Sequence, residues 1–330
     1  MIVLGVTKSP PRWLLLGLFS LIGLGGIIVG HGHLSTTSSA PPIISPVLKG
    51  GQEGNQAERY PVATPAWWRP LEGEEQELGN IYAEAYLSVD LDSGRIVFAK
   101  NHRQRLPVAS LVKVMTALVA LEHALPDEII RVSGGAAIIG EDSIGLESGE
   151  VLRLNELLFG LILVSGNDVA ETISEGIGGK REVFVEWMNL KAKELGLEDT
   201  HFVNPTGLME QDEKTGEYGA KEFSTAYDLA VMSRAFLQEP LLKTVAATPE
   251  YFIPATSSHK AYYLYSQTNL LTTDERVKGL KMGYTPEAGL CGITYAQERG
   301  REILGVVLNT PYRRDDLKAL IDKSFEVLGG

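Results

Sequence analysis

The sequence PVASLVKVMTALVAL, residues 107–121, is the stretch around which the rest of the chain is organised. Between residues 111 and 121 only Lys113 and Thr116 are polar, and a helix that is apolar on every side belongs in the interior of a domain. The proline at the start stops any earlier helix, and Ser110 falls where an N-cap or first turn is expected. The stretch therefore predicts a buried helix.

The pair Ser110 and Lys113 is the first candidate for chemistry. Three residues apart, their hydroxyl and amine would share one face of the helix. Burial disfavours an ammonium ion, so it lowers the pKa of a lysine and makes it a base toward a neighbouring serine. The alternative is a capping serine beside a lysine that snorkels to the surface. The spacing alone favours this alternative, because it arises by chance roughly once in a chain of this size.

The composition indicates an acidic globular protein. Of its 330 residues 44% are hydrophobic and 22% are charged, and the formal net charge is −12. This charge argues against nucleic acid as a partner. The single cysteine, Cys291, lies in an apolar context that indicates a buried thiol. No cysteine–histidine spacing indicates a metal site, and no cofactor is expected.

The N-terminal region predicts a membrane segment and a spacer. Two basic residues precede a mainly apolar run from Trp13 to Val29, which is short for a membrane span and long for a signal-peptide core. We interpret residues 1–34 as an uncleaved anchor, with a removed signal as the alternative, and residues 35–77 as a flexible spacer. The positive charges come first, so the domain at 78–330 is expected outside the cytoplasm, tethered to the membrane or secreted.

Within residues 78–330, strands at both ends enclose a helical region. Alternation and turn residues predict strands at 85–90, 95–99, around 280, 289–296 and 303–308. Apolar periodicity and capping residues predict further helices at 152–163, 169–177, 181–195, 224–237 and 315–328. This order indicates an α/β fold of the α+β type, with a mainly antiparallel sheet flanked by helices and a helical lobe.

Polar side chains interrupt otherwise apolar sequence in three short segments, Ser110-x-x-Lys113, Ser165-Gly166-Asn167 and Lys281-Met282-Gly283. Taken singly, the second is an ordinary turn between helices and the third a surface lysine on an edge strand. Acyl transfer explains all three, because it needs a nucleophile, a base, a proton path to the leaving amine and donors for the oxyanion.

The second and third segments have distinct expected roles. The Ser165 hydroxyl lies between two predicted helices, where it would relay a proton, and Asn167 would hold the substrate amide. Lys281 would face a substrate carboxylate and would help keep the base neutral through like-charge repulsion. Gly283 would let the substrate backbone lie against the strand edge. Asp168 is more simply explained as the cap of the following helix.

These segments, in this order and context, resemble the D-alanyl-D-alanine carboxypeptidases, the low-molecular-weight penicillin-binding proteins of the active-site serine superfamily. The resemblance runs from about Tyr86 to Phe325 and includes longer shared patterns at 105–117, 146–150, 163–168, 200–208 and 224–228. It implies the β-lactamase/transpeptidase-like fold of that family, with the site between the sheet and a helical lobe.

The same resemblance implies roles and a substrate. The residues implied as catalytic are the nucleophile Ser110, the proton acceptor Lys113 and the second serine Ser165. The residues implied as substrate-binding are Asn167, Lys281, Gly283 and Tyr284, the last through an oxyanion hole made by its backbone N–H and that of Ser110. The implied substrate is the D-Ala-D-Ala end of a peptidoglycan stem peptide, and β-lactam antibiotics such as penicillins are the implied acylating drugs.

Met282 departs from the family pattern, whose third motif is usually Lys-Thr-Gly. The threonine hydroxyl normally helps to hold the terminal carboxylate, and a thioether cannot donate that hydrogen bond. Losing one charge-assisted hydrogen bond costs roughly 1.5–3 kcal/mol unless another donor replaces it. Thr285, Arg313 and Arg314 are the candidate replacements. The chain also ends soon after its last predicted helix, so anchoring is expected from the N-terminal segment.

Four functions remain open. The leading one is a serine-type D-Ala-D-Ala carboxypeptidase. Met282 leaves room for a D,D-endopeptidase or for a non-catalytic penicillin- or wall-binding relative. A β-lactamase of the same fold is disfavoured, because no Glu-x-x-Leu-Asn segment follows Asn167. A Ser-His-Asp hydrolase is disfavoured because the Gly-x-Ser-x-Gly motif is missing.

Overall fold

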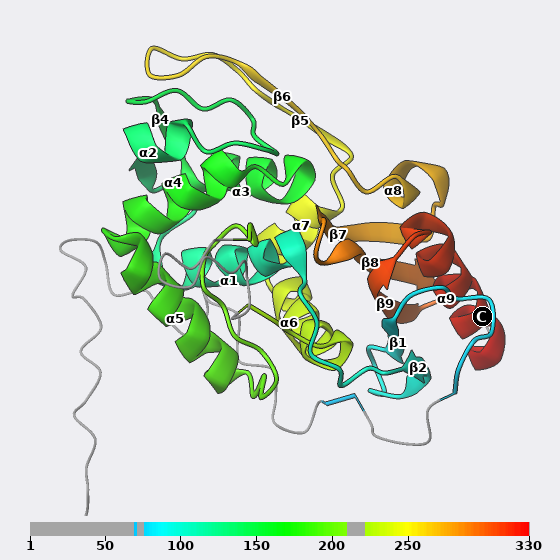
Figure 1. Ribbon diagram of the computed structural model, residues 1–330. Helices are drawn as coiled ribbons and strands as arrows, with labels where there is room; N and C mark the ends of the chain where they lie inside the picture. The colour runs from blue at the N-terminus through cyan, green and yellow to red at the C-terminus, as the bar shows by residue number, and fades with distance from the viewer. Residues whose placement is uncertain (1–68, 71–75, 210–221, 330) are drawn as a thin grey trace, which may run out of the picture. The chain divides into compact units, whose positions relative to one another are not determined.

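The computed structural model in Figure 1 describes residues 69–70, 76–209 and 222–329. All of them belong to one compact unit. The predicted anchor at 1–34 and nearly all of the predicted spacer at 35–77 lie outside the described residues, so both stay predictions. Among the described residues, no helix combines the length and hydrophobicity needed to cross a membrane.

A five-stranded sheet is the base of the fold (Figure 1). Its strands, in chain order, are β1 (Ala85–Asp90), β2 (Ile96–Lys100), β7 (Val277–Thr285), β8 (Gly289–Glu298) and β9 (Arg301–Thr310). Their order across the sheet is β2-β1-β9-β8-β7, and all neighbours are antiparallel. The predicted antiparallel sheet is confirmed. Because β7 is an outer strand, one of its edges has no strand partner in this sheet.

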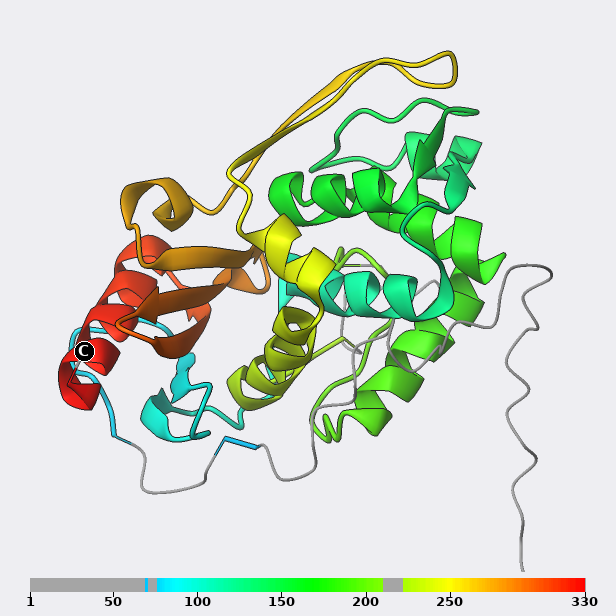
Figure 2. The same ribbon diagram turned by 180° about the vertical axis from the view of Figure 1, so that it is seen from behind.

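Helices cover the two faces of this sheet, as Figure 2 shows from behind. On one face, α9 (Arg313–Leu328) packs against β8 and β9. Leu320 and Ile321 lie three and four positions after Leu317, and Phe325 lies four after Ile321, so these buried residues form one apolar stripe. On the other face, α6 (Ala226–Gln238) packs against β1 and β9. As predicted, α6 begins at a capping residue, since the Thr225 hydroxyl accepts a hydrogen bond from the backbone N–H of Asp228.

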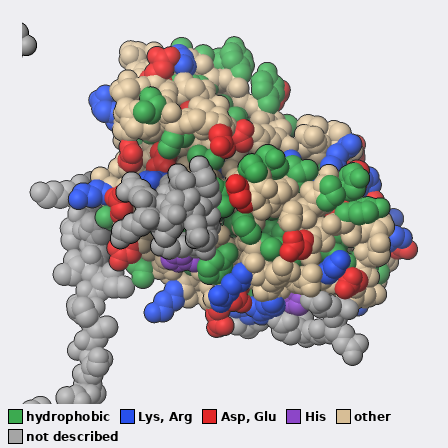
Figure 3. All heavy atoms as spheres, in the orientation of Figure 1, with side chains coloured by type: hydrophobic (Ala, Val, Ile, Leu, Met, Phe, Trp, Pro, Cys, Tyr) green, Lys and Arg blue, Asp and Glu red, His purple; other side chains and the backbone are tan. Residues whose placement is uncertain are grey.

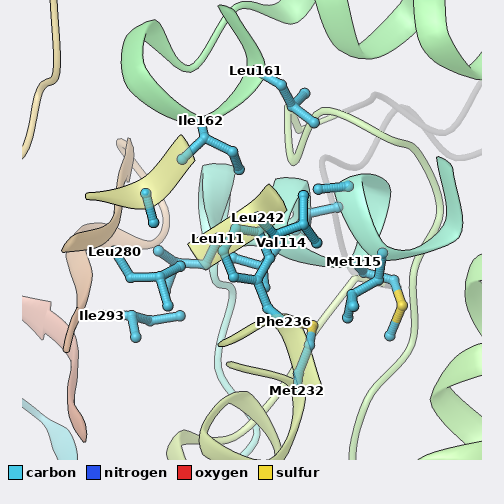
Figure 4. Packing of buried hydrophobic residues seen from close by; sticks show 14 of the residues in the cluster. Leu111, Val114, Met115, Leu161, Ile162, Met232, Phe236, Leu242, Leu280 and Ile293 are labelled. Atoms are coloured by element: carbon cyan, nitrogen blue, oxygen red, sulfur yellow. The ribbon is translucent and has the colours of Figure 1, made fainter. Parts of the chain in front are cut away.

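The predicted buried helix is α1 (Lys113–His123), and every residue from its start to Leu121 is buried. A short 3-10 turn, η2 (Ala109–Val112), precedes it and contains Ser110, which therefore lies in a first turn and does not cap the helix. Figure 4 shows the core that surrounds this helix. Side chains from η2 and α1 lie there among residues of the helical part, α6, α7 (Pro240–Ala246), β7 and β8, namely Leu161, Ile162, Met232, Phe236, Leu242, Leu280 and Ile293.

The helical part differs from prediction at one position that matters for the site. The helix predicted at 152–163 begins as α3 (Leu154–Phe159) and then widens into a π-helical segment, η3 (Gly160–Val164). Such π-segments are rare and occur mostly at functional sites. Two more helices follow, α4 (Asn167–Gly178) and α5 (Arg181–Glu194). The left-handed Gly179 ends α4, as its Gly-Gly pair predicts.

Several small elements were not predicted. They are α2 (Gly134–Ala137), α7, α8 (Leu270–Thr273), the pair β3 (Ile129–Arg131) and β4 (Val151–Arg153), and the pair β5 (Glu250–Ile253) and β6 (Tyr262–Tyr265). The β5–β6 hairpin extends along the top of Figure 1. The connection at 254–261 is longer than the two-residue turns whose sequences identify a hairpin, so the local sequence gives little indication of this hairpin.

Candidate active site

Ser110 and Lys113 meet where η2 passes into α1. The Nζ of Lys113 lies 2.8 Å from Oγ of Ser110, which agrees with the shared face expected from their spacing. Ala109, just before the serine, has a φ of 48°, a left-handed value that is uncommon for a residue with a Cβ. The turn that presents Ser110 is therefore strained, and such strain is found where the surrounding structure enforces a functional geometry.

The amine of Lys113 is fully buried among oxygen atoms. Besides Ser110, its Nζ contacts Oδ1 of Asn167 at 2.8 Å and the backbone oxygen of Thr206 at 2.5 Å. The last two oxygens can only accept hydrogen bonds, whereas a serine hydroxyl can also donate. A neutral amine therefore donates to Asn167 and Thr206 and keeps its lone pair for the Ser110 proton.

Burial makes that neutral form accessible. It lowers the pKa of Lys113 from its ordinary 10.5 to about 7, although the carboxylates of Asp142 and Glu222, next in importance, favour the charged form. At neutral pH about half of the molecules then carry an uncharged Lys113. The geometry and the protonation state together suit a base that accepts the serine proton.

Ser165 and Asn167 come from the junction between η3 and α4. Ser165 has a φ of 68°, and its Oγ is buried without a hydrogen-bond partner among the described residues. Buried hydroxyls without partners are rare and call for an explanation such as catalysis or binding. Asn167 is fixed from the other side, because its Nδ2 donates to the Gly140 oxygen at 3.2 Å and its backbone N–H to the Asp142 oxygen at 2.7 Å.

Asp168 corrects one expectation. It lies inside α4, whose N-cap is Gly166, and its carboxylate mainly binds the segment 143–146. It accepts hydrogen bonds from the Ser143 hydroxyl at 2.7 Å and from the backbone N–H groups of residues 144, 145 and 146 at 3.2, 3.0 and 2.9 Å. Because the neighbouring carbonyls at 140 and 142 hold Asn167, Asp168 anchors the loop that orients this asparagine.

The turn at 204–207 is a part of the site that the residue-level argument did not assign. The Asn204 side-chain oxygen accepts from the backbone N–H groups of Thr206 at 3.0 Å and Gly207 at 2.7 Å. Gly207 has a φ of 79°, and a Cβ there would lie 2.1 Å from the Ala109 oxygen. The available signal was the Asn-Pro-Thr-Gly sequence, which is typical of a tight turn, but nothing local shows that this turn reaches Lys113.

Strand β7 closes the site beside η2. A Cβ on Gly283 would lie 3.0 Å from the backbone nitrogen of Ser110, so the absence of a side chain lets the strand approach the serine turn. This is a different reason for glycine from the predicted contact with substrate. Tyr284, the next residue, has a side chain that is 59% exposed.

Lys281 is buried on β7, and its Nζ donates to the Met282 oxygen at 2.8 Å. The pKa of Lys281 lies well below its ordinary value. Burial is the largest cause, and the charges of Lys113 and Arg313 act in the same direction. Lys113 therefore lowers the pKa of Lys281, whereas burial and nearby carboxylates are what shift the pKa of Lys113, so the predicted help from Lys281 in keeping Lys113 neutral is not borne out. The described residues show no direct hydrogen bond from either Lys281 or Ser165 to Ser110.

Met282 faces away from the serine. Successive residues of a strand point to opposite faces, and the neighbour Gly283 faces Ser110. The sulfur of Met282 lies over Gly292, where an added Cβ would be 3.0 Å away, within the cluster that includes Leu317 of α9. A small cavity beside it is lined by Gln267, Asn269, Leu270, Met282, Arg313 and Arg314.

The three proposed replacements for the threonine hydroxyl have different surroundings. The Thr285 hydroxyl accepts from the Ala288 backbone N–H at 3.1 Å, so it belongs to the β7–β8 turn. Arg313 donates from Nη1 to the Gly283 oxygen at 2.9 Å and the Cys291 oxygen at 3.3 Å, which fixes β7 relative to β8. Arg314 is exposed at the cavity. Cys291 is buried as predicted, and burial raises the pKa of its thiol to about 11.

Known proteins share the sequence pattern of this chain over most of its length. Residues 72–312 match the family described as D-alanyl-D-alanine carboxypeptidase. The D-alanyl-D-alanine carboxypeptidase DacF of Bacillus subtilis is 34% identical over 251 residues, which cover 74% of this chain and 62% of that protein. A D-alanyl-D-alanine endopeptidase of Pseudomonas aeruginosa is 33% identical over 211 residues, which cover 62% of this chain and 64% of that protein. The match spans less than two thirds of each relative.

Solved structures agree with the fold. The crystal structure of a D-alanyl-D-alanine carboxypeptidase from Mycobacterium tuberculosis superposes with a TM-score of 0.69 at 28% sequence identity. The similarity covers 77% of this chain and 95% of that one. The antiparallel sheet with helices on both faces and a helical part beside it is therefore shared over nearly the whole of that structure.

Proposed function

The chain belongs to the D-alanyl-D-alanine carboxypeptidase family, and we propose that it removes the terminal D-alanine from peptidoglycan stem peptides through an acyl-enzyme on Ser110. One observation carries the proposal. The amine of Lys113 lies 2.8 Å from the Ser110 hydroxyl, and burial lowers its pKa to about 7. A buried lysine in this state is an effective base for a serine nucleophile.

Acylation proceeds in two balanced steps. Neutral Lys113 takes the proton of Ser110 as the serine oxygen forms a bond to the carbonyl carbon of the penultimate D-alanine. The C–N bond to the terminal D-alanine then breaks, and its nitrogen receives the proton that the serine gave up. Water subsequently attacks the ester and releases the shortened peptide, which restores Ser110. A penicillin follows the first step, since its strained amide acylates the same oxygen.

Ser165 is proposed to relay the proton to the leaving amine. Its buried hydroxyl has no partner among the described residues, so an incoming nitrogen would satisfy it. Asn167 would hold the substrate amide with the hydrogen-bonding capacity that its contacts with Lys113 and Gly140 leave over. The backbone N–H groups of Ser110 and Tyr284 would stabilise the oxyanion.

Lys281 would receive the substrate carboxylate. In the absence of substrate, burial and Lys113 disfavour its ammonium form, and a bound carboxylate would reverse this by favouring the charge. Arg313 and Arg314 lie beside the same strand and add positive charge. With these three cations nearby, loss of the usual threonine hydroxyl at Met282 need not abolish carboxylate binding.

Endopeptidase action is a second candidate, supported by a specific finding. The Pseudomonas aeruginosa relative at 33% identity is named a D-alanyl-D-alanine endopeptidase. Both reactions use the same acyl-enzyme and differ in what leaves, a free D-alanine or a crosslinked peptide. A β-lactamase would need rapid deacylation, and a non-catalytic relative would need no Ser110–Lys113 contact.

The location of the domain is also a proposal. The apolar run from Trp13 to Val29 with its preceding positive charges supports a domain held outside the cytoplasm by an N-terminal segment. This location would give access to the wall polymer and to β-lactams.

The test is the intact mass of the full-length chain after mixing with benzylpenicillin. A persistent gain of one penicillin mass, missing in Ser110→Ala, would support the acyl-enzyme. A gain that disappears within seconds to minutes would indicate a β-lactamase, and no gain would overturn the proposal. Release of D-alanine from a soluble pentapeptide, compared with cleavage of a crosslinked dimer, would then separate carboxypeptidase from endopeptidase action.

A further inference from the structure

The β5–β6 hairpin carries a row of exposed aromatic side chains. Its cross-strand register pairs Glu250 with Tyr265 and Phe252 with Tyr263. Because alternate residues of a strand share a face, these four side chains lie on one face of the hairpin. Phe252, Tyr263 and Tyr265 are 48%, 69% and 63% exposed. We call this set, with Glu250, the aromatic face.

The opposite face fixes the hairpin to the domain. Leu264 and Ile253 are buried there, and Tyr251 stacks on Phe159 of α3 with ring centroids 3.6 Å apart. The Tyr262 hydroxyl donates to the Glu150 carboxylate. One face of the hairpin is therefore packed against the core. The aromatic face is exposed, and no other segment of the described residues covers it.

Both ends of the hairpin are also held. Near the tip, the Ser258 hydroxyl donates to the Val151 oxygen at 3.2 Å, and the Val151 N–H donates to the Ser258 oxygen at 3.1 Å. At the base, Gln267 donates from its backbone to the Leu163 oxygen and from its side chain to the Val164 oxygen, both at 2.9 Å. The aromatic face is therefore rigid before any partner binds, which reduces the entropy cost of binding.

The base of the hairpin continues the wall of the site. Val164, which accepts from Gln267, is immediately followed by Ser165, and Tyr265 precedes Gln267 by two residues. Phe252 and Tyr263 already form a pair with centroids 4.5 Å apart. Residues two apart on one strand are separated by about 7 Å, so the row is long enough to meet successive units of a polymer. At the top of Figure 3, where Figure 1 draws this hairpin, a few hydrophobic side chains lie on the surface.

From this arrangement we infer that the aromatic face binds the sugar chain that carries the stem peptide, an inference that rests on the proposed function. Pyranose rings present C–H groups on their flat faces, which pack on exposed aromatic rings, while their hydroxyls donate to carboxylates and tyrosine oxygens. The aromatic face offers three rings, two phenol groups and the carboxylate of Glu250. It contains no aliphatic side chain, and aliphatic side chains predominate where protein surfaces bury a core.

Charge favours the sugar chain over a lipid surface as the binding partner. Segments that bind anionic membranes combine apolar side chains with lysine and arginine. The aromatic face instead includes Glu250, and the whole chain has a formal net charge of −12. An uncharged, hydroxyl-rich polymer fits these features better than an anionic bilayer.

The test compares two matched aromatic pairs in the full-length protein. One variant is Phe252→Thr with Tyr263→Thr, because threonine suits an exposed strand position. The control is Tyr82→Thr with Tyr312→Thr, which removes another aromatic pair, with ring centroids 5.0 Å apart, outside the hairpin. Each protein is mixed with purified insoluble peptidoglycan, sedimented, and measured for the bound fraction over a range of polymer concentrations. Circular dichroism and the Tm establish that each variant is folded.

We expect the hairpin variant to bind the polymer roughly tenfold more weakly, since two ring contacts are lost. Its labelling by a fluorescent penicillin should stay within about twofold of wild type, as should binding of the control to the polymer. Unchanged sedimentation of the hairpin variant, an equal loss in the control, or no binding by wild type would overturn the inference. The inference would also be overturned if the hairpin variant lost binding to phosphatidylglycerol vesicles but kept its binding to peptidoglycan.

This assay does not depend on turnover. If wild type fails to release D-alanine or to be acylated, the proposed function fails, yet sedimentation still decides whether the aromatic face binds the polymer. If acylation succeeds and sedimentation is unaffected by the hairpin variant, the proposed function stands and the inference about the aromatic face is wrong.

Discussion

The pH dependence of Ser110 acylation by a penicillin follows from the environment of Lys113. Burial lowers the pKa of this amine from 10.5 to about 7, which corresponds to roughly 5 kcal/mol against the ammonium form. Only the neutral amine accepts the serine proton. Its fraction rises from about 10% at pH 6 to about 90% at pH 8, so the acylation rate should rise about ninefold and level off above pH 8.

The assay is the pseudo-first-order rate of labelling by a fluorescent penicillin, quenched at fixed times between pH 5.5 and 9.5 at constant ionic strength. Ser110→Ala gives the background, and the stability of the drug is measured at each pH. With an ordinary lysine pKa, the rate would instead rise about tenfold for every pH unit and show no plateau below about pH 10. That result would refute the assignment of neutral Lys113 as the base.

A substitution tests the same reasoning from the opposite direction. The Asp142 carboxylate favours the charged form of Lys113 and is the largest such influence. Asp142→Asn should therefore shift the midpoint to lower pH, and added salt should reduce the difference, because Asp142 is exposed. Asp127→Asn, a change at another exposed acid, is the control. A shift of the Asp142→Asn midpoint to higher pH would contradict the argument.

Three further substitutions test the framework of the site. Gly207→Ala should abolish penicillin labelling, because its Cβ would lie 2.1 Å from the Ala109 oxygen; full labelling would contradict this close approach. Asp168→Asn should lower the free energy of unfolding in urea by roughly 2–4 kcal/mol and slow labelling about tenfold, since the carboxylate holds the loop beside Asn167; unchanged labelling would separate the loop from the site. Met282→Thr should cost roughly 1–3 kcal/mol of stability, because the side chain is buried against α9, without faster release of D-alanine. A several-fold faster release would mean that position 282 contacts substrate.

Much of the fold follows from local pattern. Residues 85–90 alternate and end at an Asp-Ser-Gly turn, and they form β1 within the same bounds. The apolar stretch at 111–121 is buried as the end of η2 and most of α1, since a helix without a polar face belongs in the interior. The β5–β6 hairpin was missed because its strands are short and its connection is long, so its register depends on packing against α3.

The site, like the fold, has a part that local sequence predicts and a part that it does not. Helical geometry places residues three positions apart on one face, so the spacing of Ser110 and Lys113 made their contact possible, and the apolar stretch around them favoured it. The roles of Ser165, Asn167 and Lys281 were carried by an overall resemblance, and no local rule relates segments so distant in the chain. The oxygen of Thr206 lies 93 positions from Lys113, and its contact depends on a turn that fits against Ala109.

Local sequence accounts for the nucleophile and its base, because a single helical turn relates them. Packing between distant segments accounts for the rest: it removes water from Lys113 and lowers its pKa, it directs Met282 toward α9, and it makes Gly283 necessary beside Ser110. These properties depend on burial and on which strand face meets which helix. Neither the burial of a side chain nor the pairing of a strand face with a helix is defined until segments about a hundred or more residues apart are brought together.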